Sequence, residues 1–123
     1  MKPRFDETQP IFQQIADMIE DDILNGTYLE DDQIISISQL AGTFQINPAT
    51  AVKGVALLVN EGILYKKRGL GMFVTADAKQ TIIMKRRDRF YNELVLKLLD
   101  EAEKLNLSTE DVIDMIRQKN RGE

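Results

Sequence analysis

Apolar residues recur at steps of three and four along most of the chain, which is the spacing of amphipathic helices. The first such face begins behind Pro10 and ends before Gly26, a residue type that favours the turn after a helix. Its apolar members are Ile11, Ile15, Met18, Ile19 and Ile23, and the acids expected on its outer face are Asp17, Glu20, Asp21 and Asp22. Residues 27–35 then combine acids with turn-forming residues and predict an irregular connection.

Two helix start signals stand close together in the next part of the chain. Ser36 and Gln39 have the spacing of a capping box, in which each side chain bonds the backbone N–H of the other residue. Asn47 followed by Pro48 is an N-cap followed by the residue favoured at the first helical position. About three residues separate the first helix from the second, which runs from Pro48 to about Gly62, and this is helix-turn-helix spacing.

A rotation of about 100° per residue divides the helix from Pro48 into two faces. The predicted core face comprises Ala51, Val52, Val55, Leu58 and Val59, and the opposite face comprises Ala49, Thr50, Lys53, Leu57 and Asn60. Asn47, Thr50 and Lys53 place hydrogen-bonding groups and a cation near one end of the helix, which suits a DNA groove with phosphates on its rim. For this helix alone, an ordinary solvated face is an equally good interpretation.

A basic turn between two short β-prone runs predicts a hairpin over residues 63–75. Gly69 and Gly71 supply the backbone freedom that such a turn needs. Lys67 and Arg68 stand at the tip, where a cation can meet a phosphate or enter a minor groove. The order helix, helix, turn, helix, hairpin is that of a winged helix-turn-helix.

A long helix is expected from about residue 77 to Leu105, and a last helix begins at the capping box of Ser108 and Asp111. Ile82, Ile83 and Met84 extend the apolar stripe of this tail upstream, and Val112, Ile113 and Ile116 are expected to be buried by the last helix. Two helices cannot enclose this stripe alone, so the stripe must pack on the first domain, on a second copy of the chain, or on both. We favour self-association, because soluble homo-oligomers are most often two-fold dimers. The residues assigned to dimerisation are Phe90, Leu94, Leu98, Ala102, Leu105, Val112 and Ile116.

The predicted fold class is therefore mainly α with a small β-hairpin. A winged helix-turn-helix DNA-binding domain is expected over residues 1–76 and a helical dimerisation tail over 77–123. The chain of 123 residues has no Cys and no His, which excludes thiol nucleophiles, Ser–His triads and the commonest metal ligand. We expect no cofactor, no metal and no enzyme. No apolar run reaches the roughly 18 residues of a membrane span, and the charged start is unlike a signal peptide, so a cytoplasmic protein is expected.

Charge is distributed unevenly behind the net value of −4. Residues 1–35 carry two basic and nine acidic groups, whereas residues 36–76 carry four basic groups and one acid. Residues 77–123 carry ten of each sign. An acidic chain is unlike a non-specific nucleic-acid coat, but the local basic segment is compatible with a directed face for a polyanion.

Several motifs, in the right order, resemble the GntR-type bacterial transcription regulators. Residues 10–15, PIFQQI, are similar to that family's opening P-I/L-Y/F-x-Q-I, and residues 46–50, INPAT, are similar to V-N-P-x-T. Ser36 with the following Leu-Ala matches P-S-x-R-x-L-A, and residues 68–74 match the wing R-G-x-G-x-F-V. The helical tail resembles the YtrA-like subfamily, whose C-terminal part is a dimerising helix pair. The specific match covers about residues 10–75.

The resemblance implies a homodimer that binds a two-fold operator and represses transcription, through a recognition helix over 48–61 and a wing over 67–71. The positions it assigns to DNA contact are Ser36, Asn47, Ala49, Thr50, Lys53, Arg68, Gly69 and Gly71. The candidate DNA-binding residues also include Ser38, Pro48, Lys67 and Leu70. Ser38 replaces the family's Arg, and Leu70 replaces a basic residue often found between the wing glycines. Relatives commonly carry Arg and Glu where this recognition helix is apolar, so Leu57 is expected to be exposed or in an interface.

A dimeric winged-helix module for protein interaction, with weak or lost DNA binding, is the alternative function. The overall acidity, Ser38, Leu70 and the apolar recognition helix favour it. Retention on heparin at low salt discriminates between the two functions, because only DNA binding predicts it. A small-molecule effector stays open as a partner. Because a helix pair is too short to wall a pocket of the usual size, its site would have to lie between the tail and the winged domain or between subunits.

Overall fold

A computed structural model describes residues 5–122, which form two compact units, one ending at Ile83 and the other beginning at Met84. The elements of the first unit are α1 (Ile11–Leu24), α2 (Ile37–Phe44), α3 (Pro48–Asn60), β1 (Leu64–Lys67), β2 (Gly71–Val74) and the start of α4 (Ala78–Arg89). Those of the second are the rest of α4, the π-helical segment η1 (Phe90–Val95), α5 (Leu96–Lys104) and α6 (Thr109–Asn120). The predicted class, mainly helical with a two-stranded antiparallel hairpin, is confirmed.

The helix starts lie where the capping signals predict them. The Gln39 N–H donates to Ser36 Oγ (3.1 Å) and the Ser36 N–H to Gln39 Oε1 (3.3 Å), which completes the capping box of α2. Asn47 caps α3, with Pro48 at its first position. Ser108 and Asp111 form the second capping box, at α6. Because these pairs satisfy backbone donors that a helix start leaves unbonded, local sequence alone fixes where α2, α3 and α6 begin.

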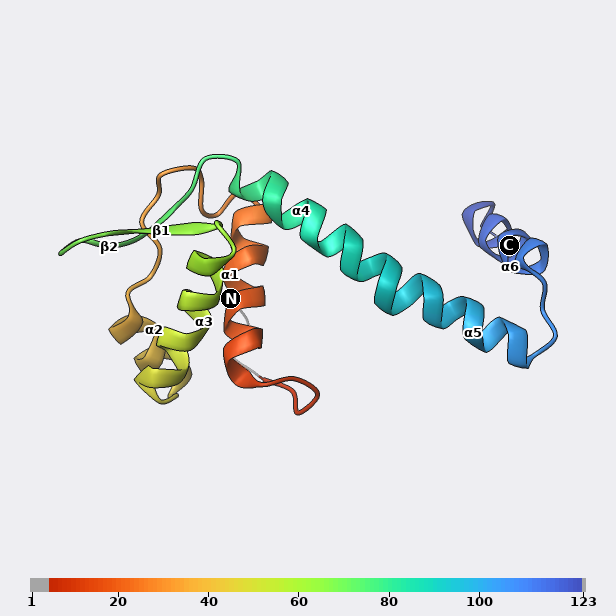
Figure 1. The fold of residues 1–123 in the computed structure, drawn as a ribbon, viewed down its shortest axis with the longest axis horizontal. Helices are drawn as coiled ribbons and strands as arrows, with labels where there is room; N and C mark the ends of the chain where they lie inside the picture. The colour runs from red at the N-terminus through yellow and green to blue at the C-terminus, as the bar shows by residue number, and fades with distance from the viewer. Residues whose placement is uncertain (1–4, 123) are drawn as a thin grey trace. The chain divides into compact units, whose positions relative to one another are not determined.

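The core of the first unit lies between α1 and α3, which pack side by side, with α2 beside the start of α3 and the hairpin beyond its end (Figure 1). Its largest fully buried side chains include Ile15 and Ile19 of α1, Leu58 of α3 and Ile63 before β1. Ala78 and Ile82 of α4 belong to the same core. Ile82 was expected in the apolar stripe of the tail, and this expectation is wrong because the first turns of α4 complete the core of the winged unit.

Gly54 lets α3 approach α1 closely. A Cβ at this position would lie 2.8 Å from the backbone oxygen of Phe12 and 3.0 Å from a methyl carbon of Ile15. Contacts under about 3 Å are too short for carbon, so only a residue without a side chain fits. The sequence does not indicate this role of Gly54, since an isolated glycine in a helix has no periodic signal.

The burial of four residues, two on α3 and two on α1, differs from the prediction. Val52 was assigned to the core but is half exposed, and Leu57, expected outside, packs partly buried against the core. The reason is that α3 turns its Gly54 side toward α1, which rotates the buried face away from Val52 and toward Leu57. On α1, Glu20 and Asp22 are buried although the outer face was expected, because α1 is covered on more than one side.

The hairpin gains a third pairing partner from the segment before α2. β1 and β2 pair antiparallel, with Leu64 opposite Val74 and Lys67 opposite Gly71. Gln33 forms an isolated antiparallel bridge with Phe73, and the Ile34 N–H donates to the Met72 carbonyl (3.0 Å). Because residues 31–34 bond the outer edge of β2, the hairpin is anchored to the chain that leads into α2. The connection predicted as irregular therefore contains strand-like pairing.

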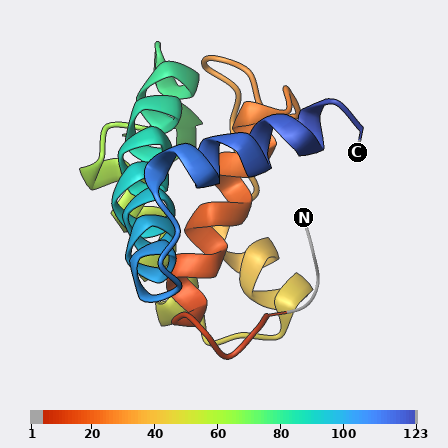
Figure 2. The same ribbon diagram turned by 90° about the vertical axis from the view of Figure 1, so that its right-hand side faces the viewer.

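The second unit is a helix pair with an uncovered apolar surface. The long helix predicted to end near Leu105 is present, but it is interrupted by η1, whose π-type bonding rotates the side chains after it relative to those before it. Asn106 has a φ of 58°, and α6 runs out of line with α5 (Figure 1 and Figure 2). Ala102 and Val112 are buried within the chain, whereas Ile116, expected to be buried, is exposed.

No helix within residues 5–122 is both long enough and apolar enough to cross a membrane.

We predict that Gly54→Ala destabilises the protein by about 1–3 kcal/mol, because the new methyl group overpacks the contact between α1 and α3. Gly42→Ala is the matched control: Gly42 lies within α2, and a Cβ there meets nothing within 4 Å. Alanine is the better helix former, so the control should gain up to about 1 kcal/mol. Urea unfolding followed by circular dichroism measures both changes, and equal stabilities of the two variants would contradict the close packing.

Candidate nucleic-acid interface

The N-terminal end of α3 is open to solvent. Asn47, Pro48 and Ala49 are exposed, and Thr50 is half-buried. The Ala49 N–H donates to Asn47 Oδ1 (2.9 Å), so the Asn47 side chain holds the helix start. The end of a helix that carries free N–H groups has a partial positive charge and attracts phosphate. This end therefore offers short side chains and an electrostatic preference for an anion.

Lys53 lies one turn further along α3 and is exposed. Its ammonium group stands 4.1 Å from the centre of the Phe12 ring of α1, a cation–π contact. The ring holds the lysine toward the α1 side of the α3 surface without removing its charge. This position suits a phosphate contact beside α3 better than a base contact in front of it.

The start of α2 supplies the serines of the predicted site. Both Ser36 and Ser38 are exposed. The Ser36 hydroxyl forms hydrogen bonds with Gln39 in the capping box, so it stabilises the start of α2 whether or not it also contacts DNA. Ser38 lies on the first turn of α2, where the neutral hydroxyl offers no charge to a phosphate.

Two glycines shape the tip of the hairpin. Gly69 has a φ of 79° and Gly71 a φ of 127°, both in the region that side chains disfavour. The Leu70 N–H donates to the Lys67 carbonyl (2.9 Å) and closes the turn. Arg68 and Leu70 project from the turn as exposed side chains. The Lys67 ammonium lies 4.3 Å from the centre of the Phe73 ring, so this cation is held along the hairpin.

Gln33 is a residue of the site that sequence reasoning missed. Its Nε2 donates to the Leu70 carbonyl (2.6 Å), and a Cβ on Gly71 would lie 2.8 Å from the same nitrogen. The side chain therefore ties the hairpin tip to the segment before α2, and Gly71 leaves room for it. Only the acidic, turn-rich character of residues 27–35 was visible in the sequence, and nothing in it indicates a bond across 37 residues.

Two acids of the segment before α2 also form hydrogen bonds near the hairpin. The Tyr65 hydroxyl donates to Asp31 Oδ1 (2.7 Å), and the Leu29 N–H donates to Asp32 Oδ2 (2.8 Å). The bond to Asp31, together with burial and the nearby carboxylates, raises the pKa of Tyr65 above its ordinary value. These acids have partners within the fold, so their role is structural.

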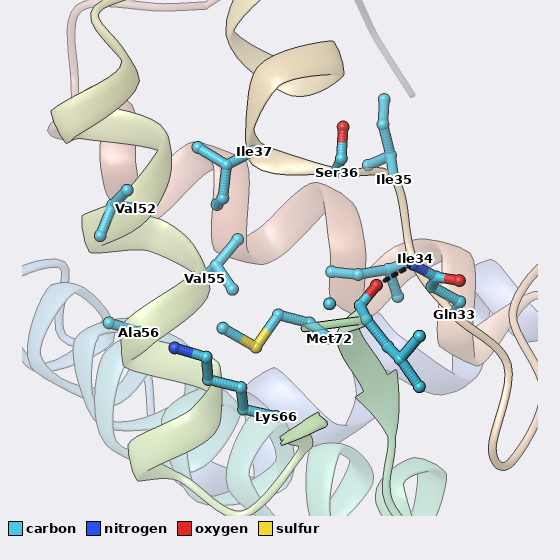
Figure 3. A pocket seen from close by; sticks show the side chains of 12 residues that line it. Gln33, Ile34, Ile35, Ser36, Ile37, Val52, Val55, Ala56, Lys66 and Met72 are labelled. Carbon is cyan, nitrogen blue, oxygen red and sulfur yellow. Dashed lines mark hydrogen bonds between the residues drawn. The ribbon is translucent and has the colours of Figure 1, made fainter. Parts of the chain in front are cut away.

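An apolar hollow of about 360 Å³ separates α3 from the hairpin (Figure 3). Val52, Val55 and Ala56 form its α3 side, and Leu70 and Met72 contribute from the hairpin. The segment before α2 closes it with Gln33, Ile34, Ile35, Ser36 and Ile37. Lys66 extends along the hollow toward α3 as its one cation (Figure 3). The hollow brings Ser36, Leu70 and Gly71 of the predicted site together.

The sequence profile of the bacterial regulatory proteins of the gntR family matches residues 11–74 of the chain, which is most of the winged unit. The chain belongs to this family. The predicted family is therefore confirmed, and with it the winged helix-turn-helix fold. The proteins of the family and the named relatives are transcriptional regulators, so DNA-binding regulation is the class of activity that the chain carries.

Similar proteins cover both units. The HTH-type transcriptional repressor YtrA of Bacillus subtilis is 29% identical over 103 residues, which is 79% of each protein. The crystal structure of a GntR-family regulator of Bacteroides thetaiotaomicron has a TM-score of 0.78 at 32% identity, and the match covers 90% of this chain and 96% of that one. The DNA-binding domain of AraR in complex with an operator has a TM-score of 0.54 at 29% identity, covering 61% of this chain and 90% of that one.

We predict that Gln33→Ala lowers the free energy of unfolding by about 0.5–1.5 kcal/mol, because it removes the bond to Leu70 and leaves that carbonyl to water. Hydrogen exchange at the Leu70 N–H should become faster as the turn loosens. Gln80→Ala, an exposed substitution on α4, is the matched control and should change neither quantity. Equal exchange rates in the two variants would show that Gln33 does not hold the hairpin.

Proposed function

We propose that this regulator is a repressor that binds a two-fold operator as a homodimer, with α3 in the major groove and residues 67–71 on the DNA backbone or in the minor groove. The observation that carries the proposal is the exposed N-terminal end of α3 on the same compact unit as the exposed cations Lys53, Lys66, Lys67 and Arg68. Helix-turn-helix proteins insert this end of the second helix into the groove, and wings contact the flanking backbone.

Electrostatics supports a directed contact. The chain has a net charge of −4, so it is not attracted to DNA over its whole surface. The four cations named above, present once in each subunit of a dimer, can together neutralise about 4–8 phosphates. Acids of the connection before α2 are engaged with Tyr65 and with backbone N–H groups, which gives them a task within the fold.

The exposed apolar side chains of the second unit support dimerisation. Phe90, Leu94, Leu98 and Leu105 are exposed, and so is Ile116 of α6. Exposed apolar surface on this scale is typical of an interface between proteins. Of the residues assigned to dimerisation, Ala102 and Val112 are buried inside the chain instead, where they pack the helices that carry the exposed residues. A two-fold dimer would present two copies of α3 to an operator with the same symmetry.

The proposed repressor role is supported by this arrangement and by the name of a relative. A dimer that occupies an operator blocks access to the DNA beneath it without needing a further domain. The relative YtrA, which shares 79% of its length with this chain, is named a repressor. A dimeric module for protein interaction is the second candidate, because Val52 and Leu70 are exposed apolar residues next to the proposed DNA face. Retention on heparin at low salt tests between the two candidates.

We predict that Lys53→Ala and Arg68→Ala each weaken binding to all DNA sequences by a similar factor. The logarithm of the affinity against the logarithm of salt should have a slope on the order of −4 to −7, and each variant should reduce its magnitude by about one per subunit. Lys79→Ala removes an exposed cation from the start of α4 and is the control that should leave the slope unchanged. Fluorescence anisotropy with a duplex selected from random DNA provides the affinities.

If neither Lys53→Ala nor Arg68→Ala changes the affinity, α3 and the hairpin are not the DNA face, and the interaction module becomes the better candidate.

We also predict that Leu94→Glu converts a dimer into a monomer. The wild-type protein should scatter light with twice the chain mass of 14.0 kDa, and the variant with that mass alone. Leu94 is 58% exposed within the chain, so a charge there is tolerated by the fold but not by a dry interface. Leu29→Glu, at a position 62% exposed in the first unit, is the matched control and should stay dimeric. A monomeric wild-type protein at micromolar concentration would contradict the proposal.

A further inference from the structure

The exposed face of α3 is apolar at its centre. At about 100° per residue, Ala49 and Ala56 share nearly the same direction, with Val52 on one side of them and Lys53 on the other. All four are exposed, while Ala51, Gly54, Val55 and Leu58 are buried on the opposite side. From Ala49 to Ala56, the surface that α3 presents outward therefore consists of two methyl groups and an isopropyl group, bordered by one cation, and the exposed Asn60 follows in the same direction at the C-terminal end of the helix.

Polar groups stand at the edges of this face. The ammonium group of Lys53 is drawn to the Phe12 ring of α1, and the Asn47 side chain bonds the Ala49 N–H as the helix cap. Thr50 is half-buried. From Ala49 to Ala56, the centre of the face thus has no hydrogen-bonding side chain that could pair with the edge of a guanine or an adenine.

Val52 is uncovered because the hollow separates it from the hairpin. Val52 lies on the α3 side of the hollow, near Ala56, and Ile37 and Met72 lie across the hollow from it (Figure 3). Half of its surface is exposed, although an isopropyl group of a helix normally packs against a neighbour. With Ala56 beside it, this exposed isopropyl group offers an apolar contact to whatever binds the outward face of α3.

We propose that Val52, with Ala56 beside it, reads the C5-methyl groups of thymines in the operator. The proposal rests on the function given above, in which α3 enters the major groove. The thymine methyl is the apolar group that a base pair displays there, and small apolar side chains are its usual contacts. Lys53 on α3 and Lys66 in the lining of the hollow flank the apolar face, which favours DNA as its occupant over an uncharged protein or a neutral small molecule.

Replacing thymine by deoxyuridine in the operator tests the proposal, because it removes the methyl group and keeps every hydrogen-bonding group of the base. The full-length protein is used first to select a duplex from random DNA. Each thymine of that duplex is then replaced singly, and binding is measured by fluorescence anisotropy at fixed salt. We expect at least one thymine in each half-site at which the replacement weakens binding about 3- to 5-fold, the effect of burying one methyl-sized group.

Val52→Ser assigns the effect to its side chain. The variant should bind the thymine and the deoxyuridine duplexes with equal affinity at the sensitive position, because the partner of the methyl group is gone. Val52 is exposed, so the substitution leaves the core intact, and a melting curve checks this. Leu29→Ser removes an exposed apolar side chain elsewhere on the same unit and should keep the full sensitivity to deoxyuridine.

Three outcomes would count against the proposal, and they are distinguishable. Equal binding of every thymine and deoxyuridine duplex by the wild-type protein overturns methyl reading but leaves DNA recognition standing. Sensitivity that persists undiminished in Val52→Ser overturns the assignment to Val52. Failure to recover any duplex bound more tightly than random DNA overturns the proposed function itself.

Discussion

At Gly54 the backbone of α1 comes within 2.8 Å of the place where any other residue of α3 would carry its Cβ. This contact fixes how far apart the two helices lie and which side of α3 is turned inward. With Gly54 against Phe12 and Ile15, the outward side of α3 is the one that carries Ala49, Val52 and Lys53. The same closeness brings the Phe12 ring under the Lys53 ammonium group, so one missing side chain sets both the packing and the position of the nearest cation.

The hairpin depends on a second constraint, which comes from the chain before α2. Residues 31–34 bond the outer edge of β2, and the Gln33 amide reaches the Leu70 carbonyl. A two-stranded hairpin alone is marginally stable in water. The extra pairing therefore gives the wing a fixed orientation relative to the start of α2, whose capping box is two residues further on. Gly71 permits this arrangement, because a side chain there would strike Gln33.

Local signals predicted the fold well, and long-range contacts explain the failures. Caps at Ser36, Asn47 and Ser108, and the paired glycines of the hairpin, are encoded within a few residues, so the sequence was sufficient to place them. The exposure of Val52 depends on the rotation of α3, which Gly54 decides through a contact with another helix. A helical wheel weighs only the polarity of side chains, and it places an apolar valine inside. Likewise, the roles of Gln33 and Ile82 depend on partners far away in the sequence. The residues that contact DNA and those that form a dimer stay predictions.

In the proposed DNA complex, charge sets the strength of non-specific attraction, and apolar contacts contribute to sequence preference. The protein has a net charge of −4, and its residues 1–35 are rich in acids, so its electrostatic attraction to DNA is weak when it approaches with a surface other than the basic one. The proposed DNA face has four cations, and two of them, Lys53 and Lys67, lie over aromatic rings, which limits the directions in which they attract phosphate. Weak non-specific attraction lowers competition from the excess of unrelated DNA sites. In the proposed complex, small apolar contacts in the major groove would then be sufficient to separate one sequence from another, because the specificity ratio depends on the difference between bound states and not on the total affinity.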